Sequence, residues 1–569
     1  MRERPDKLKI FVLLVALFVA VPSAADQLAL RTEGTVPAAA GESDLPWSSV
    51  VRELQLSLFD LGYYQGPIDG RPNSEMDEAI DRFQREQGAI GEGSDWPNML
   101  VRIQAIGAAV QMKKALKRAR EEQIKKARIS LQTNAATRDL ACEKKLAPAN
   151  PARKPEACFA NPTVRCLLDE ALESIRGVNR AKFRNWALKE LIRVEARLGL
   201  DRQARDNMCR MSDPRLVLLS MREIAVIMAR AGRLDDASAL AETIPDAGNR
   251  VRALAAIASI GAKAGDRVAT RLATRRVLDL LEARPDSAER TDIAARMAVE
   301  LEAAGEAELA REALAEARDH ARSADPGRRD AALGHLATAL SEMDDPEAAF
   351  EMIERIEGPG DRRSAMIAGS AALARAGKAQ AALERATAVP DVRYRVLALC
   401  GVAVAQYRLG DKDISRRALV RAHDGAEKIE SSYAADFARS RIAEAEAAVG
   451  NVEAAKESAE KIKNRALKAR TLWRIAAART EAGDLEVMAS IESVAVLATR
   501  EVKSTLERTN ILSDVAIAFA AGGRSEEAWE MFDQAMAAAA KIRTRWWRAR
   551  ALARIAATLD TLGRIAKRR

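Results

Sequence analysis

The segment IAVIMARAGRLDDASAL, residues Ile224–Leu240, contains the pattern that decides the fold of most of this chain. Ile224 and Ala225 precede Gly232 by eight and seven residues, and Ala237 follows that glycine by five. The segment predicts two helices joined at Gly232, because glycine adopts the left-handed conformation that ends a helix without steric cost. An alanine at a fixed position on each helix lets the two helices approach closely.

The same pattern recurs along the chain at intervals of 33, 39 or 40 residues. An alanine stands seven residues before the turn residue in nine of eleven repeats. A single hairpin cannot bury its own apolar face, so these repeats predict an all-α solenoid of about eleven helical hairpins over residues 166–569. The alternative is an alanine-rich helical bundle without repeats. The predicted turn residues are Gly199, Gly232, Gly265, Gly305, Asp344, Gly377, Gly410, Gly450, Gly483, Gly523 and Gly563.

This repeat resembles the tetratricopeptide repeat, although that family's early tryptophan and mid-helix tyrosine are mostly alanine here. The resemblance implies that the first helix of each hairpin forms an inner face, at positions thirteen, ten, six and three residues before each turn. Those positions are mostly small or apolar and include Tyr407, Phe437 and Trp473. We therefore expect an unidentified envelope protein to bind there through an apolar peptide or helix.

A second pattern surrounds LGYYQGPIDG, residues Leu61–Gly70, which is unusual in a chain with only 4% aromatic residues. Apolar residues at helical spacing precede and follow it, so the segment predicts a helix, a tight turn and a helix. Residues 47–104 resemble the small three-helix peptidoglycan-binding domain, on the residues Arg52, Leu54, Gln55, Leu58, Leu61-Gly62-Tyr63-Tyr64, Gly66, Asp69-Gly70, Ala79-Ile80 and Phe83-Gln84.

The resemblance implies peptidoglycan as a partner, with Tyr63, Tyr64, Asp69 and Gln84 as candidate binding residues. Aromatic rings beside a rigid turn offer flat apolar faces to a sugar and leave hydroxyl groups for hydrogen bonds. In the alternative interpretation, one tyrosine packs on Phe83 and the other is merely exposed.

The first 25 residues indicate export. Four basic residues precede the apolar run FVLLVALFVAV, and the small residues Ser23, Ala24 and Ala25 follow it. This arrangement is typical of a cleaved signal peptide over 1–25, with a retained membrane anchor as the alternative. No other stretch is long and apolar enough to span a membrane. We therefore expect a periplasmic protein without a transmembrane segment after cleavage.

Three further segments complete the predicted organisation. Residues 26–46 are small and polar and predict a flexible linker, and residues 105–132 predict a charged helical spacer. Helix-forming residues over 99–132 favour one continuous helix. Residues 133–165 predict a Pro-rich loop that contains cysteines.

Four cysteines, Cys142, Cys158, Cys166 and Cys209, lie around the start of the repeats. An exported chain can oxidise them into disulfides. Cys166 stands where a turn would fall, 33 residues before Gly199, so it begins a second helix; Cys209 lies near the far end of the next second helix. These positions differ by about 15 Å along the helix axis, which excludes a Cys166–Cys209 bridge.

Cys166 is therefore expected to pair with Cys142 or Cys158, and Cys209 with the other. The bridges would hold the Pro-rich loop over the first hairpin as a cap. Cys400, inside a repeat helix, is expected to stay reduced.

No catalytic residue, metal site or cofactor is predicted. The three histidines, His320, His335 and His423, lie in repeat helices without ligand spacing, and no phosphate-binding loop is present. The net charge of +9 favours anionic partners, but export argues against nucleic acid. The sequence therefore predicts a non-enzymatic, peptidoglycan-associated scaffold; the alternative is a cell-wall hydrolase, or a regulatory subunit of one, with an unrecognised active site.

Overall fold

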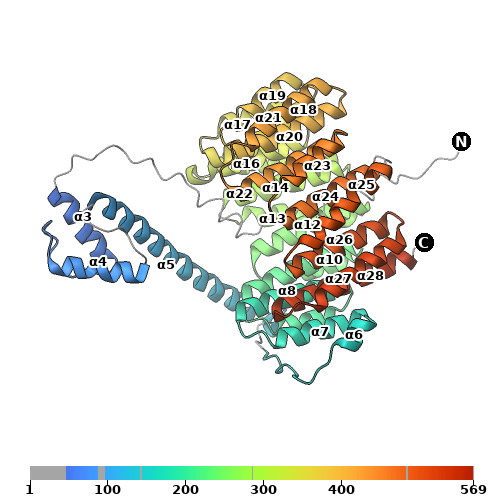
Figure 1. The fold of residues 1–569 in the computed structure, drawn as a ribbon, viewed down its shortest axis with the longest axis horizontal. Coiled ribbons are helices and arrows are strands. Elements are labelled where there is room, and N and C mark those ends of the chain that lie inside the picture. The colour runs from blue at the N-terminus through green and yellow to red at the C-terminus, as the bar shows by residue number, and fades with distance from the viewer. Residues whose placement is uncertain are drawn as a thin grey trace. The chain divides into compact units, whose positions relative to one another are not determined.

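The computed structural model describes residues 47–87, 96–140, 142, 144–284, 286–481 and 485–567. These residues form helices α3 to α28 and one short 3-10 helix, η1 (Arg138–Leu140), and within these ranges there is no strand (Figure 1). The all-α prediction is confirmed. The predicted signal peptide, 1–25, and linker, 26–46, lie outside the described residues. In the described ranges no helix has the length and apolar character needed to cross a bilayer.

The chain divides into two compact units after Glu121. The first unit contains α3 (Trp47–Asp60), α4 (Ser74–Gln87) and the first part of α5 (Trp96–Thr133). Its core is made by the apolar positions that recur at helical spacing, and the side chains of Leu54, Phe83 and Ile103 are completely buried.

Helix α5 is continuous over the 99–132 stretch, as expected, so the predicted domain boundary at residue 104 falls inside a helix. Gly107 lies where α5 passes the end of α3. A Cβ atom at this position would stand 3.1 Å from Leu61 Cδ1, so the glycine permits this close approach.

The second unit consists mainly of helical hairpins, in which a first helix is followed by a second helix of equal or shorter length. The first helices are α8 (Ala181–Arg197), α10 (Pro214–Arg230), α12 (Ala247–Ala264), α14 (Ser287–Ala303), α16 (Pro326–Glu342), α18 (Pro359–Arg375), α20 (Val392–Arg408), α22 (Ser432–Ala448), α24 (Arg465–Glu481) and α26 (Thr505–Ala521). The second helices are α9 (Asp201–Met208), α11 (Leu234–Thr243), α13 (Arg267–Glu282), α15 (Ala307–Arg322), α17 (Pro346–Glu354), α19 (Ala379–Thr387), α21 (Lys412–Ala426), α23 (Val452–Glu460), α25 (Leu485–Glu501) and α27 (Ser525–Ala540).

The predicted turn residues end first helices by adopting positive φ angles. Asp344, with φ 56°, does so without being a glycine, and eight of the predicted glycines do the same. Gly483 lies outside the described residues. The prediction for Gly563 is wrong, because α28 (Arg545–Lys567) continues through it. The glycines with positive φ are Gly199, Gly232, Gly265, Gly305, Gly377, Gly410, Gly450 and Gly523.

The alanines of the repeat are buried where helices meet. Ala225, seven residues before its turn, and Ala237, five residues after it, both have no exposed surface. The same holds for Ala258, Ala298 and Ala403 in other hairpins. Small side chains at these positions let the two helices of a hairpin approach closely, as the sequence predicted.

The array of hairpins closes on itself. Each first helix packs on the next from α8 to α26 and then α28, and α28 packs in turn on α8. Neighbouring first helices contact each other more extensively than neighbouring second helices, so the first helices form the inner layer of the ring. The eleventh hairpin joins α28 to α7 (Val164–Arg176), from opposite ends of the unit. In Figure 1 the red α28 lies beside the teal α7 and α8.

Aromatic contacts with α8 and one side-chain-to-backbone hydrogen bond hold α28 at this closure. The ring of Trp546 in α28 stacks on Phe183, with centroids 4.8 Å apart, and meets Trp186 edge-on at 6.3 Å. Arg545 Nη1 donates to the carbonyl oxygen of Gly177 at 3.0 Å. Helix α28 therefore covers the first hairpin. The sequence analysis expected the Pro-rich loop to cover it instead.

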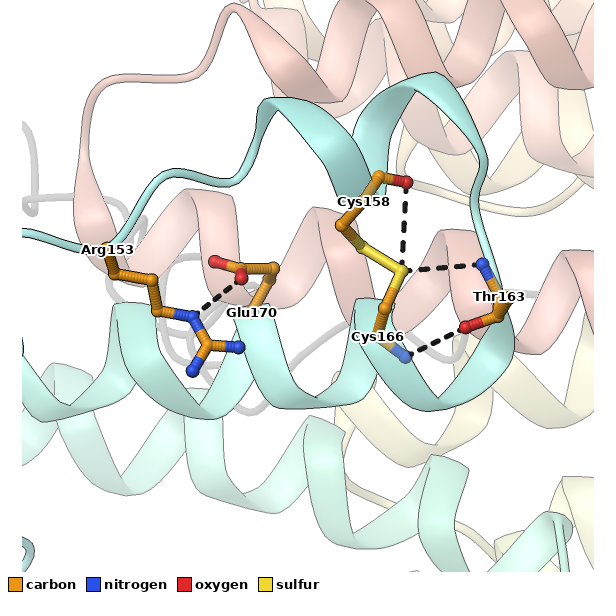
Figure 2. Close-up of a disulfide and its surroundings, with 5 residues drawn as sticks. All are labelled: Arg153, Cys158, Thr163, Cys166 and Glu170. Carbon is orange, nitrogen blue, oxygen red and sulfur yellow. Dashed lines mark hydrogen bonds and ion pairs between the residues drawn. A yellow bond between two sulfur atoms is a disulfide. The ribbon is translucent and has the colours of Figure 1, made fainter.

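The structure pairs Cys158 with Cys166 and Cys142 with Cys209, with Cα atoms 5.8 and 5.4 Å apart. Cys400 is a buried free thiol. Figure 2 shows the Cys158–Cys166 bridge, which joins α6 (Glu156–Ala160) to the first turn of α7.

Two interactions in Figure 2 hold the neighbourhood of this bridge. The Cys166 N–H donates to Thr163 Oγ1 at 3.2 Å, which caps α7, and Arg153 pairs with Glu170 at 2.6 Å. Phe159, beside the bridge, lies under the guanidinium of Arg548 at 5.3 Å. The Pro-rich loop is thus fastened to α7 and also contacts α28.

Glu195 of α8 is a buried carboxyl group that faces α9, with 5% of its surface exposed. Asn207 Nδ2 donates to its Oε1 at 2.7 Å, whereas its Oε2 has no hydrogen-bond partner in the described structure. Burial raises the pKa of Glu195 to about 7, although Asn207 and Arg210 act in the opposite direction.

This shift predicts a pH-dependent stability. Between pH 4.5 and 7 the folded protein keeps a proton that the unfolded chain has lost, so raising the pH through this window destabilises the fold. The loss is on the order of 3 kcal/mol when ionisation is complete. Urea unfolding at pH 5 and pH 8 should therefore show a smaller decrease in the Glu195→Gln variant than in the wild type. An identical decrease in both proteins would contradict the assignment.

Candidate peptidoglycan-binding site

The turn between α3 and α4 is organised by the buried side chain of Gln55. Its Oε1 accepts from the backbone N–H of Gly70 at 2.8 Å, and its Nε2 donates to the carbonyl oxygen of Arg71 at 2.9 Å. Gly70 has a φ angle of 77°, and a Cβ there would collide with the backbone of Ser48. The glycine of the Asp-Gly motif is therefore required by the backbone path of the turn.

Tyr64 is part of the framework of this turn. Only 1% of the residue is exposed; its hydroxyl donates to the carbonyl oxygen of Pro67 at 2.8 Å and accepts from Asn73 Nδ2 at 2.9 Å. A buried ring offers no face to a sugar. The structure therefore removes Tyr64 from the predicted contact residues and gives it a structural role.

Tyr63 is half-buried and remains the aromatic candidate. Its ring meets Phe83 edge-on, with centroids 5.2 Å apart, and its carbonyl oxygen accepts from Arg82 Nη2 at 2.6 Å. In the alternative interpretation of the sequence, one of the two tyrosines packs on Phe83. In the structure this tyrosine is Tyr63. This packing fixes the orientation of the ring and leaves part of it accessible.

Of the two polar candidates, Asp69 and Gln84, the structure describes the side chain of Asp69 alone. Asp69 is exposed, and its Oδ1 accepts from the Arg71 N–H at 2.9 Å and from Gln55 Nε2 at 3.3 Å. The hydrogen bond from the Arg71 backbone lowers the pKa of Asp69 most, and the one from Gln55 lowers it further. The carboxyl group therefore stays ionised. Gln84 lies in α4, and its side chain is outside the described part of the structure.

A shallow groove between the end of α3 and α5 was not predicted from the sequence. Its apolar lining residues are Leu61, Ile103, Gly107 and Ala108, and the others are polar. This combination of apolar surface and hydrogen-bonding groups suits an amphipathic ligand such as a sugar. The polar lining residues are Ser57, Asp60, Gln104 and Gln111.

The three partner-binding candidates in the second unit have different environments. Phe437 is 44% exposed, so it is presented to solvent. Tyr407 is partly buried against the core of its hairpins. The Trp473 indole N–H donates to Thr499 Oγ1 at 2.9 Å and its ring packs on Phe519, so this side chain is used within the fold. Only Phe437 is well placed for an outside partner.

The first unit is a small helical module with a hydrogen-bonded Gly-Tyr-Tyr turn between α3 and α4. Residues 48–89 match the family model described as "Putative peptidoglycan binding domain". This match, over α3 and α4, supports the peptidoglycan-binding domain that the sequence resemblance indicated. No curated protein matches the chain.

Two solved structures align with this chain at low similarity. The crystal structure of Ton1535 from Thermococcus onnurineus NA1 is 18% identical, with 58% of this chain and 98% of that chain covered and a TM-score of 0.27. A circular tandem repeat protein with novel repeat topology and enhanced subunit contact surfaces is 15% identical, with coverages of 92% and 98% and a TM-score of 0.16.

Proposed function

We propose that the protein is an exported, non-enzymatic adaptor that binds peptidoglycan through its first unit and presents the helical ring to an envelope protein. The observation that carries this proposal is the match of residues 48–89 to the peptidoglycan-binding family, on a turn that the structure shows to be fully organised. The two cysteine pairs support the exported, periplasmic location, because disulfides persist in oxidising compartments.

Substitution of Tyr63 tests the wall-binding part. In the Tyr63→Leu variant an apolar side chain still covers Phe83, but the flat aromatic face is lost. We expect the variant to sediment with insoluble peptidoglycan with roughly fivefold lower affinity, which corresponds to about 1 kcal/mol for one aromatic contact. Circular dichroism should show unchanged helicity.

Tyr433→Leu is the matched control, because Tyr433 is an exposed tyrosine of the second unit. Its sedimentation should equal that of the wild type. Failure of the wild-type chain to sediment would reject wall binding, whereas equal sedimentation of both variants would reject Tyr63 as a contact. Zymography with the same proteins tests the non-enzymatic part, and clearing of the peptidoglycan would favour a hydrolase.

A further inference from the structure

Four aromatic rings gather on the surface where α28 meets α8. The ring of Trp546 contacts those of Phe183 and Trp186, and its centroid also lies 5.5 Å from that of Trp547. We call these four residues the tryptophan platform. Two of its rings are accessible to a ligand, because Trp186 is 41% exposed and Trp547 is 36% exposed.

The accessible rings are held in place by their neighbours. Phe183 and Trp546 stack with an angle of 14° between their planes, and Trp186 meets Phe183 edge-on at 6.0 Å. Lys182 Nζ lies 4.9 Å from the centroid of the Trp186 ring. A ligand therefore meets rings that are already oriented, which lowers the entropic cost of binding. Because Trp186 and Trp547 both contact Trp546, one short oligosaccharide can reach both.

The two segments that carry the platform are basic. Residues 176–189 contain five lysines and arginines and no carboxylate, and residues 541–554 contain six and none. Lys182, Arg543 and Arg545 are exposed, and in the part of the chain that the structure describes none of them pairs with a carboxylate. Helices α8 and α28 both begin here, so the partial positive charges of their first turns add to the field.

This combination suits an anionic glycan. Flat aromatic faces pack on the apolar faces of sugar rings, and ammonium and guanidinium groups pair with carboxylates. Peptidoglycan offers both groups, on its sugar strands and on the peptides attached to them. A bilayer is a poorer match, because insertion requires apolar side chains that protrude, whereas these rings are packed against one another. Single-stranded nucleic acid has a similar chemistry, but the proposed exported location excludes it.

We propose that the tryptophan platform is a second peptidoglycan-binding site of this chain. Trp186 and Trp547 stack on sugar rings of the strand, and the exposed cations beside them pair with carboxylates of its peptides. This inference rests on the proposed wall-binding function and extends it to the helical ring, which lies outside the family match at residues 48–89.

Sedimentation of the full-length chain with insoluble peptidoglycan tests the platform. Trp186→Leu/Trp547→Leu keeps an apolar cover but loses both accessible rings, so its affinity should fall roughly tenfold. The control is Tyr433→Leu/Trp529→Leu, which replaces two exposed aromatic residues elsewhere in the second unit. It should sediment like the wild type, and circular dichroism should show unchanged helicity in both variants.

A second pair of variants leaves the packing of the rings untouched. Lys182→Gln/Arg543→Gln removes two exposed cations beside the platform and should lower the affinity for peptidoglycan roughly threefold. Arg271→Gln/Arg275→Gln removes the same charge from exposed positions of α13 and should bind like the wild type.

Three results would overturn the proposal: wild-type sedimentation of both platform variants, equal weakening by their controls, or loss of binding to phosphatidylglycerol vesicles with unchanged sedimentation. The last result would assign the platform to a lipid surface. Tyr63→Leu separates this proposal from the first one. If Tyr63→Leu loses affinity and the platform variants do not, the first unit binds the wall and the platform does not; the reverse pattern keeps the platform and rejects Tyr63. Failure of the wild type to sediment would reject both.

Discussion

Ending the chain after Ala540 is expected to cause the second unit to unfold at a much lower urea concentration than in the wild type. The deletion removes α28, whose Leu552, Ile555 and Leu562 are 0%, 0% and 3% exposed. Burial of three such side chains contributes roughly 5 to 8 kcal/mol. The deletion also exposes the apolar faces of α7 and α8, because α28 covers both. Circular dichroism during urea titration measures the change.

A point variant tests the same closure in a chain that keeps all of its helices. Trp546→Ala removes the ring that stacks on Phe183, and we expect it to lower the free energy of unfolding by about 2 kcal/mol. Trp529→Ala is the control, because Trp529 is 40% exposed and its ring meets Phe532 of the same helix. Its effect should be clearly smaller.

Equal effects of the two tryptophan variants, together with wild-type stability of the deleted chain, would contradict the closed ring. The second unit would then behave as an open solenoid whose ends are stable without each other.

The hairpins could be predicted from the sequence because each turn has a local cause. A glycine or Asp344 adopts positive φ, and alanines at fixed distances on either side meet inside the hairpin. Gly563 matched the spacing, but the helix continues through it. The reason is tertiary: α7 packs beside α28 in the place of a second helix.

Closure of the ring did leave a signal in the sequence. Cys166, at a turn position, lies in the first turn of α7, which takes the place of a second helix, and α28 takes the place of the first helix that packs on it. These two elements complete one hairpin. Periodicity alone could not reveal their contact, because the same pattern is compatible with an open array.

The turn of the first unit shows a different limit of sequence reasoning. Its presence followed from the Gly-Tyr-Tyr motif, but the motif does not say which of two adjacent tyrosines faces the core. That choice depends on Gln55 and Asn73, whose hydrogen bonds draw the hydroxyl of Tyr64 inward. The orientation of Trp473 likewise depends on a residue outside the repeat pattern. Its indole N–H donates to Thr499 of the neighbouring α25.

The two disulfides should differ in their contribution to stability, because they close loops of different length. Cys142 and Cys209 are 67 residues apart, whereas Cys158 and Cys166 are 8 residues apart. Loop-closure entropy predicts that loss of the first bridge lowers the free energy of unfolding by about 4 kcal/mol, and loss of the second by about 2.5 kcal/mol. Cys142→Ser/Cys209→Ser should therefore unfold at a lower urea concentration than Cys158→Ser/Cys166→Ser.

The serine variants remove each disulfide and can keep the hydrogen bonds around it. Cys166 Sγ accepts from the Thr163 N–H at 3.4 Å, and a serine hydroxyl at this position can keep that cap. Cys400→Ala is the control for thiol exchange, because burial raises the pKa of Cys400 to about 12 and keeps its thiol protonated. Reductant should shift the unfolding midpoint of the wild type by more than that of either double variant. No shift with reductant, or the reverse order of the two variants, would contradict this pairing, since each bridge stabilises the fold according to the chain length that it closes.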